Sequence, residues 1–317
     1  REIIHKLVAQ ADVVVENFKP GTIERLGYGY DALRAIKPDL VYASISGFGQ
    51  TGPRAGLPAF DGAIPASSGM LSTSGRPETG PVRSGYFAVD MSTALNAAFA
   101  ITAALLRRAN TGEGQRVDIS MLDTALFMQA PQMTGYLVTG NVPELNGNAS
   151  PTKQPTSNVF ASRDGYVQVI AMKETQVEAL FGELGIPEQY IEFNEPGKRL
   201  GRRDELHSML APLIAAQDTE HWLHALDAIG VPVSAIQDFP TIAAEPQLAH
   251  REVIVDMAHH EDPEKSVKVV RASHVAEPGS PSIQGPSPTL GAHSEEILEE
   301  LGYSAQEIGA MRDAGMI

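Results

Sequence analysis

Apolar residues near the start of the chain follow two different spacings in turn. Four of them lie on one face at the 3.6-residue period of a helix: Ile3, Ile4, Leu7 and Val8. The unbroken run "ADVVVENF" (11–18) then predicts a buried parallel strand, and "DLVYASIS" (39–46) predicts the next one. Between them, the pattern predicts a turn with a short helix over 19–27 and a helix over 30–38 that Pro38 ends. Strand, helix and strand in this order indicate a right-handed crossover and an α/β fold.

A long uncharged segment follows a single carboxylate, Asp90. The next charged residue is Arg107, and the spacing predicts a helix from Asp90 to about Arg108. Asn110 and Gly112 are the signals that end it. Alternating apolar and polar residues over 114–121 then predict a half-buried strand, and a second helix follows over 122–138.

The composition changes after about residue 143, which indicates a second domain. Residues 143–157 are rich in Pro, Asn and Ser and read as a loop or linker. A hairpin turning at Asp164-Gly165, helices, two short antiparallel strands and a proline-rich crossing follow, and the last helix opens with a capping box of Ser304 and Glu307. We expect a large domain over 1–150, a smaller α+β domain over 151–247, and a return segment with C-terminal helices over 248–317.

The composition excludes several classes of protein and of binding site. Of the 317 residues, 43% are hydrophobic and 20% charged, as in a soluble globular protein, and the net charge of −15 argues against nucleic-acid binding. The chain has no cysteine, which excludes disulfides and cysteine-based metal sites. Residues 91–106 are too short and too polar to span a bilayer, and no signal peptide is visible, so we expect no membrane contact and a cytoplasmic location. The chain opens on a helix without methionine, so we expect earlier strands of the large domain in the natural protein.

Several short motifs are rejected on their context. Gly47, Gly49 and Gly52 match the GxGxxG dinucleotide pattern, but prolines follow and no helix can begin there. No GxSxG elbow and no GxxxxGK[ST] loop occurs. The spacing of one polar group matches no ligand rule, so we predict a solvated turn and no metal: His250, His259, His260, Glu261 and Asp262.

Two carboxylates, Asp90 and Asp123, stand at predicted helix starts. Each reads as a carboxylate that satisfies free N–H groups and the helix dipole, and the same field keeps Asp90 ionised. Asp90 also reads as a nucleophile at the edge of an apolar core. Local sequence does not separate these two readings.

Several of these segments together resemble the family III CoA-transferases, the relatives of formyl-CoA transferase and carnitine CoA-transferase. The resemblance spans nearly the whole chain and rests on "ADVVVENFKPGTIERLG", "VYASISGFGQTGP", the segment from "FAVDMSTALNAAF" to "VDISMLDTAL", and the ending "LGAHSEEILEELGYSAQEIGAMRDAGMI". It implies a Rossmann-like large CoA-binding domain, incomplete at its N-terminus, plus the small domain. It also implies a homodimer of interlocked rings.

The resemblance assigns roles to residues. It makes Asp90 the nucleophile, which attacks an acyl-CoA thioester to give a mixed anhydride and passes through an aspartyl-CoA thioester to a carboxylic acid acceptor. Coenzyme A is then a substrate, with no tightly bound cofactor. The residues that match the family's CoA contacts are Asn17, Phe18 and Lys19 after the first strand, Arg25 near the phosphates, Pro58, Ala59, Phe60 and Asp61 lining the site, and Met121 near the thiol.

The chain departs from the family pattern at several points. Pro58 stands where relatives often carry a cation, and residues 146–160 lack the glycine tetrad of the formyl-CoA enzyme, which argues against formyl or oxalate specificity. An α-methylacyl-CoA racemase is the main alternative, but its histidine would fall at Phe60, which cannot transfer protons. A catalytically silent CoA-binding protein is the second alternative.

Overall fold

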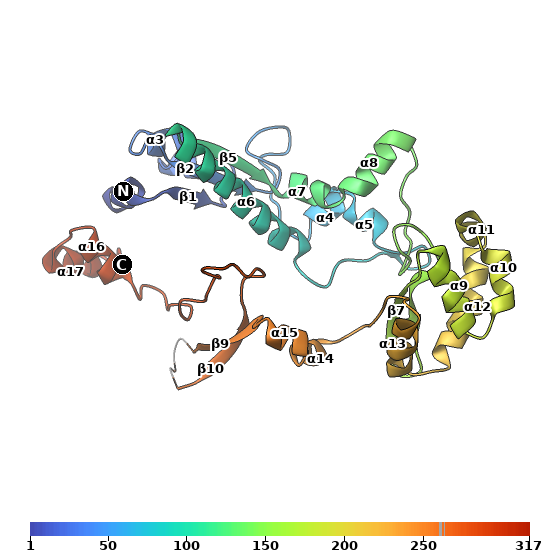
Figure 1. The fold of residues 1–317 in the computed structure, drawn as a ribbon. Helices are drawn as coiled ribbons and strands as arrows, with labels where there is room; N and C mark the ends of the chain where they lie inside the picture. Colours follow the sequence, from blue (N-terminus) through green and yellow to red (C-terminus); the bar gives the residue numbers. More distant parts are fainter. Residues whose placement is uncertain (260–261, 263) are drawn as a thin grey trace.

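A three-stranded parallel sheet organises the N-terminal lobe of the chain (Figure 1). The computed structural model describes residues 1–259, 262 and 264–317. The strand order is β1-β2-β5, with Val41 of β2 opposite Val13 and Gln115. The lobe contains α1 (Glu2–Gln10), β1 (Val13–Glu16), α2 (Thr22–Leu26), α3 (Tyr30–Arg34), β2 (Val41–Ser46), α4 (Ile64–Ser67), α5 (Met70–Thr73), β3 (Gly75–Arg76), β4 (Gly80–Pro81), α6 (Ala88–Thr111), β5 (Gln115–Ser120), α7 (Met121–Met128) and α8 (Ala130–Thr139). The α/β prediction is therefore confirmed.

The central strand β2 is covered on both faces because successive side chains alternate. Tyr42 packs with Val8 and Leu33, whereas Ala43 packs with Ala97 of α6. The outer strand β1 differs from its prediction as a buried strand: Val15 is 53% exposed. Its apolar run predicted burial, but β1 lies at the edge of this sheet. The helix predicted over 122–138 is divided into α7 and α8 at Gln129, two residues before Pro131.

Helix α6 presents two different apolar faces. Small residues on one face, including Ala97 and Ala104, are buried and let the helix approach the sheet. The opposite face carries a stripe of exposed side chains, which we call the α6 stripe: Met91, Leu95, Phe99 and Leu106.

The length of α6 corrects one expectation from the sequence. The helix has 24 residues rather than the 16 considered above, and an 18-residue window within it has a mean hydropathy of 1.5, with 22% of that window buried. By length and composition alone it is therefore able to cross a membrane. Core helices of soluble proteins meet the same criterion, and α6 packs one face on the sheet.

A second lobe is built on an antiparallel sheet of order β6-β7-β8. Its core contains Phe160, Phe181, Leu210 and Trp222, all buried. The hairpin at Asp164-Gly165 and the three longest helices follow the sequence prediction. The lobe contains β6 (Ser157–Ala161), β7 (Tyr166–Ile170), α9 (Glu174–Glu183), the 3-10 helix η1 (Pro187–Gln189), α10 (Tyr190–Phe193), α11 (Pro196–Gly201), α12 (Arg203–Ala215), α13 (Thr219–Ala228) and β8 (Val233–Ala235).

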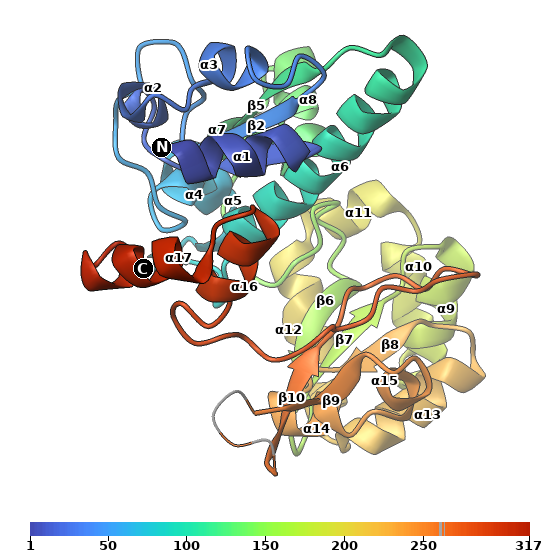
Figure 2. The ribbon, with the colours of Figure 1, turned by 90° about the vertical axis from the view of Figure 1, so that its left-hand side faces the viewer.

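The last segment of the chain returns to the N-terminal lobe. Lys6 Nζ on α1 donates to the carbonyl oxygen of Leu301 at 3.3 Å and lies 3.8 Å from the centre of the Tyr303 ring. Figure 2 shows α16 and α17 beside α1 accordingly. The segment contains α14 (Phe239–Ala243), α15 (Pro246–His250), the antiparallel pair β9 (Ile254–Ala258) and β10 (Ser266–Val270), α16 (Ser294–Glu300) and α17 (Ala305–Asp313), whose capping box forms as predicted. The predicted turn at His260 and Glu261 lies outside the described residues.

Candidate active site

The first turn of α6 is capped by a carboxylate from a distant loop. Asp61 is buried, and its Oδ1 accepts hydrogen bonds from the backbone N–H groups of Val89 (2.9 Å) and Asp90 (3.0 Å). The N-cap residue, Phe87, offers no side-chain hydrogen bond. Asp90 is the third residue of the helix, so the reading of Asp90 as the helix cap is wrong. Because Asp61 satisfies the free N–H groups, the Asp90 carboxylate is left without a capping role.

Gly47 brings the Asp61 segment to this position. A Cβ on Gly47 would lie 1.9 Å from the Cβ of Ala59, so only glycine permits the 58–61 segment to pack against the end of β2. The carbonyl oxygen of Gly47 also accepts a hydrogen bond from the N–H of Leu122 at 3.0 Å. The loop after β2 therefore holds both the Asp61 segment and the start of α7.

The remaining glycines of that loop shape its backbone. Gly49 and Gly52 have φ values of 85° and 98°, in the left-handed region that favours glycine. The N–H of Gln50 donates to the Asp118 carboxylate, with a shortest distance of 2.9 Å. Between Gly47 and Ile64, where every residue is described, no helix begins, so this loop lacks the structural context of a dinucleotide fingerprint.

An apolar cluster lies beneath the start of α6. Ile64, Val89, Met121 and Ala125 are buried together, and Ala59 packs against them. The structure thus brings Ala59, expected to line the site, and Met121, expected near the CoA thiol, against Val89, the residue that precedes Asp90. Phe60 differs: it is 75% exposed. The side chain of Asp61 faces the backbone of α6.

The environment of Asp90 raises its pKa. Desolvation by the surrounding chain is the larger cause, and the negative charge of Asp61 is the second. The sequence-based expectation that the helix dipole keeps Asp90 ionised stays a prediction, and the structure adds two influences that act in the opposite direction. Desolvation and a like charge both disfavour the carboxylate form, whereas a helix dipole favours it.

Asp123 does not cap α7, although the sequence suggested that it satisfies the free N–H groups there. Ser120 caps α7, because its Oγ accepts a hydrogen bond from the N–H of Asp123 at 3.2 Å. Asp123 lies in the first turn, where a negative charge is stabilised by the helix dipole.

The residues expected to contact the rest of CoA follow the carboxyl end of β1. Asn17 Nδ2 donates to the carbonyl oxygen of Ile45 at 2.8 Å, which ties the ends of β1 and β2 together. Phe18 is half-exposed, and Lys19 is exposed. Arg25 on α2 donates to Thr22 Oγ1 at 2.9 Å, and the described residues give it no acidic partner. Because parallel strands end at one edge of the sheet, these residues, the Gly47 loop and Met121 share that edge.

One cation to which the sequence assigned no role, Arg83, lies beside the segment that carries Asp61. Arg83 Nη2 lies 3.1 Å from the position of a Cβ on Gly62, the residue after Asp61. Its guanidinium has no hydrogen bond or ion pair within the described ranges. The available signal was its place in "PVRSGYFAVD", since it is the last charged residue before Asp90.

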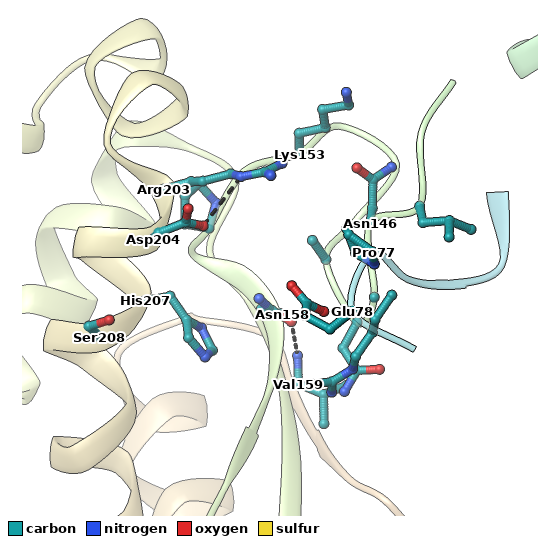
Figure 3. A pocket seen from close by; sticks show the side chains of 16 residues that line it. Pro77, Glu78, Asn146, Lys153, Asn158, Val159, Arg203, Asp204, His207 and Ser208 are labelled. Carbon is teal, nitrogen blue, oxygen red and sulfur yellow. Dashed lines mark hydrogen bonds and ion pairs between the residues drawn. The ribbon is translucent and has the colours of Figure 1, made fainter. Parts of the chain in front are cut away.

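A separate cavity of about 380 Å³ lies between the two lobes (Figure 3). It is lined by the β3–β4 hairpin, the linker after α8 and helix α12. None of the residues that the sequence predicted to bind CoA or to react lines it. In the part of the chain that the structure describes, no group of three or more His, Asp or Glu is placed to hold a metal ion.

Comparison with known proteins gives consistent results. The model of CoA-transferase family III matches residues 1–294. An acyl-CoA transferase from Fusarium pseudograminearum is 35% identical over 319 residues, covering 100% of this chain and 70% of the relative. The succinyl-CoA:glutarate CoA-transferase of Homo sapiens is 32% identical over 322 residues, covering 100% of this chain and 72% of the relative. The crystal structure of a CAIB/BAIF family protein from Brucella suis aligns with a TM-score of 0.83 at 32% identity, covering 95% of this chain and 78% of that chain.

Proposed function

Because this chain belongs to CoA-transferase family III and is a CoA-transferase acting on acyl-CoA and carboxylic acids, we propose that Asp90 is its covalent nucleophile. The observation that carries the proposal is the capping of α6 by Asp61. It leaves the Asp90 carboxylate free at the helix start, beside an apolar cluster and above the edge of the sheet. A carboxylate in such a place is available for attack on a carbonyl group.

The reaction divides into balanced exchanges. The Asp90 carboxylate attacks the thioester carbonyl, the C–S bond breaks, and a mixed anhydride and the CoA thiolate form. The thiolate attacks the aspartyl carbonyl, which releases the donor acid and leaves an aspartyl-CoA thioester. The acceptor carboxylate attacks this thioester, the C–S bond breaks, and a second anhydride and the CoA thiolate form. Attack of the thiolate on the acceptor carbonyl then frees Asp90 and gives the new acyl-CoA.

The raised pKa of Asp90 supports this role. A more basic carboxylate is a stronger nucleophile than an ordinary one, provided that it is ionised.

We assign the CoA chain to the sheet edge. Asn17, Phe18 and Lys19 would contact the nucleotide half, with Arg25 at a phosphate, where a guanidinium without an acidic partner suits an anion. Pro58, Ala59 and Phe60 with Met121 would line the path of the thiol arm. Asp61 serves this path indirectly, as the positioning residue for Asp90.

For the acceptor we propose a dicarboxylic acid. The human relative is named for succinyl-CoA and glutarate, and both acids carry two carboxylates. In this proposal the Arg83 guanidinium, which lies beside Gly62, pairs with the second carboxylate while the first reacts at Asp90.

We also propose that two copies of the chain associate through the α6 stripe. An apolar stripe of this size on a helix otherwise packed on a sheet is typical of a protein interface. A dimer of interlocked rings accords with the course of the chain, which returns from the second lobe to α1. Separately, we propose a cytoplasmic location.

The proposal is tested by trapping the acyl-enzyme. We expect a labelled acyl-CoA to acylate the protein, and hydroxylamine to convert Asp90 to a hydroxamate that peptide mass spectrometry locates. Asp90→Ala should show no label and no CoA transfer, yet remain folded. Asp123→Ala is the matched control, since it removes another first-turn carboxylate, and should retain the label.

Two results would contradict the proposal. Labelling of Asp90→Ala at the wild-type level would remove this residue from the mechanism. A racemase would instead exchange the α-proton of a 2-methylacyl-CoA for deuterium without forming an acyl-enzyme, and a silent CoA-binding protein would show neither reaction.

A further inference from the structure

The loop after β2 emerges at the carboxyl edge of the sheet, beside the apolar cluster beneath α6. Residues 47–52 form this Gly47 loop. The side chain of Phe48 packs against the cluster, which contains Val89, the residue before Asp90. Asn17, the first residue proposed to contact CoA, donates to a carbonyl oxygen at the end of the same strand. The loop is therefore close to both the proposed CoA residues and the proposed nucleophile.

One peptide of this loop is oriented by a hydrogen bond at its carbonyl end. The carbonyl oxygen of Gly47 accepts the N–H of Leu122 at 3.0 Å, so it points toward α7, which follows β5. The peptide is trans, and in a planar trans peptide the N–H points opposite to the carbonyl oxygen. The N–H of Phe48 therefore points away from β5, to the side of β2 on which β1 and Asn17 lie.

The N–H group of Phe48 has no partner. Within the described residues, which include all of 47–63, no oxygen accepts a hydrogen bond from it. Phe48 is half-buried, and an unpaired backbone N–H away from water costs free energy unless a bound molecule accepts from it. A carbonyl oxygen of a ligand would satisfy this donor.

The carboxylate of Asp118 holds the other end of the same short stretch. Both of its oxygens accept the N–H of Gln50, at 2.9 and 3.2 Å. A hydrogen bond to a charged acceptor is stronger than one between neutral groups. Asp118 forms no ion pair in the part of the chain that the structure describes, so its carboxylate is left to the loop. With Gly47 held by Leu122 and Gln50 held by Asp118, the backbone between them keeps one conformation.

We propose that the N–H of Phe48 binds a carbonyl oxygen of the thiol arm of CoA, and that Asp118 is the positioning residue that keeps this N–H in place. The inference rests on the proposed path of CoA along the sheet edge. The thiol arm carries amide carbonyls, which accept hydrogen bonds from backbone N–H groups as peptide carbonyls do. Asp118 does not touch CoA and acts through the backbone of Gln50. No bond is formed or broken in this contact, so it contributes to binding.

Calorimetric titration of the wild type and of two Asp118 variants tests the contact. The probes are CoA and its adenosine bisphosphate half, which lacks the thiol arm. We expect Asp118→Ala to weaken CoA binding about fivefold, the usual effect of losing one neutral hydrogen bond. Binding of the bisphosphate should stay unchanged. Asp118→Asn should bind CoA nearly as the wild type does, because its amide oxygen still accepts the N–H of Gln50.

Asp164→Ala is the matched control for Asp118→Ala. The Asp164 carboxylate also accepts a backbone N–H, that of Thr219 at 2.8 Å, but in the second lobe. This variant should bind both probes as the wild type does. Urea titration of both alanine variants checks that they are folded, so that a loss of CoA binding confined to Asp118→Ala is not a general loss of structure.

Gly49→Ala tests the loop without changing Asp118. The φ of Gly49 is 85°, so alanine is strained there, although the nearest atom to its Cβ would lie at an ordinary 3.8 Å. The strained backbone should turn the N–H of Phe48 and weaken the binding of CoA but not of the bisphosphate. Adding Asp118→Ala should lower the affinity little further, because both changes act on the same stretch. Gly230→Ala, at a φ of 73° in the second lobe, is the control and should bind as the wild type does.

Four other outcomes would overturn the inference. Equal losses for CoA and the bisphosphate in Asp118→Ala would assign Asp118 to the nucleotide contacts. Unchanged CoA binding in that variant, or losses that add fully to those of Gly49→Ala, would show that Asp118 does not hold the donor. A lower kcat with unchanged CoA affinity would move the contact from the thiol arm to the thioester oxygen.

These titrations involve no turnover, so they separate this inference from the role of Asp90. If Asp90 is not the nucleophile, the acyl-enzyme is absent but the differences between CoA and the bisphosphate remain. If the wild type binds the bisphosphate and CoA with equal affinity, the thiol arm has no contact with the protein, and the inference fails while acylation of Asp90 is still observed.

Discussion

Two carboxylates at the start of α6 differ in their burial and in their hydrogen bonds. Asp61 is buried and accepts two backbone hydrogen bonds, so its charge is balanced by peptide N–H groups. Asp90 lies in the first turn of α6 and is only partly desolvated. The first carboxylate supports the helix, and the second remains for chemistry.

The direction of the Asp90 pKa shift leads to a prediction for activity. The nucleophile is the ionised form, so kcat/KM should fall with decreasing pH at a value above 3.8, the ordinary pKa of an aspartate. Asp61→Asn removes the second cause of the shift and should move this inflection to lower pH. A pH–rate profile with an inflection unchanged by Asp61→Asn would contradict the coupling.

The raised pKa of Asp90 also determines how the stability of the fold changes with pH. A carboxyl group with a raised folded-state pKa binds protons more tightly in the folded state, so its stabilising contribution is present at low pH and is lost as pH rises through that pKa. Asp90→Asn should therefore be at least as stable as the wild type at neutral pH. The difference should vanish below the ordinary pKa of 3.8, as denaturant titrations at several pH values would show.

At the level of single elements, α6 is a long helix whose first turn depends on another segment. Its own N-cap residue contributes no side-chain bond, and the 58–61 loop, admitted by Gly47, supplies the cap. The element therefore forms in full only when the loop after β2 has docked.

This dependence predicts a loss of both stability and activity in Asp61→Ala. Loss of a cap lowers the free energy of unfolding by roughly 0.5–2 kcal/mol. The rate of CoA transfer should fall by more than this loss of stability accounts for, because the Asp90 backbone is no longer held. Asp238→Ala removes the cap of α14 in the same way and is the matched control. It should lose comparable stability in urea titration while its transfer rate stays near that of the wild type. Equal activity of the two variants would show that Asp61 does not position Asp90.

At the scale of the whole molecule, the α6 stripe exposes four large apolar side chains along one helix. Phe99 is 75% exposed on a face that lies opposite the buried alanines. Burial of such side chains against a second copy would stabilise the pair by roughly 1.5–3 kcal/mol each.

We predict that the wild-type chain sediments as a dimer and that Phe99→Glu dissociates it, with at least a tenfold rise in the dissociation constant. Ile191→Glu, at an exposed apolar position of the second lobe, should remain dimeric. Analytical ultracentrifugation distinguishes these states. If the wild-type chain is a monomer that binds lipid vesicles through α6, the dimer is contradicted and the α6 stripe is a membrane interface.

Much of the fold followed from spacing along the chain. The helix over residues 2–10, the strands that became β1 and β2, the hairpin at Asp164-Gly165 and the capping box at Ser304 are local features, because period, turn residues and caps act over a few neighbouring positions. The family resemblance identified a CoA-transferase, which the comparisons confirm. The domain boundaries and the roles of the site residues stay predictions.

Only the tertiary structure decided what Asp61 and Gly47 do. Asp61 lies 28 residues before Val89, and no local pattern shows that its carboxylate reaches that N–H group. The close approach of Ala59 to Gly47 and the exposure of Val15 also depend on which segments pack together. The sequence shows which carboxylates exist, but their charge state and hydrogen-bond partners depend on burial and on neighbours brought from elsewhere in the chain.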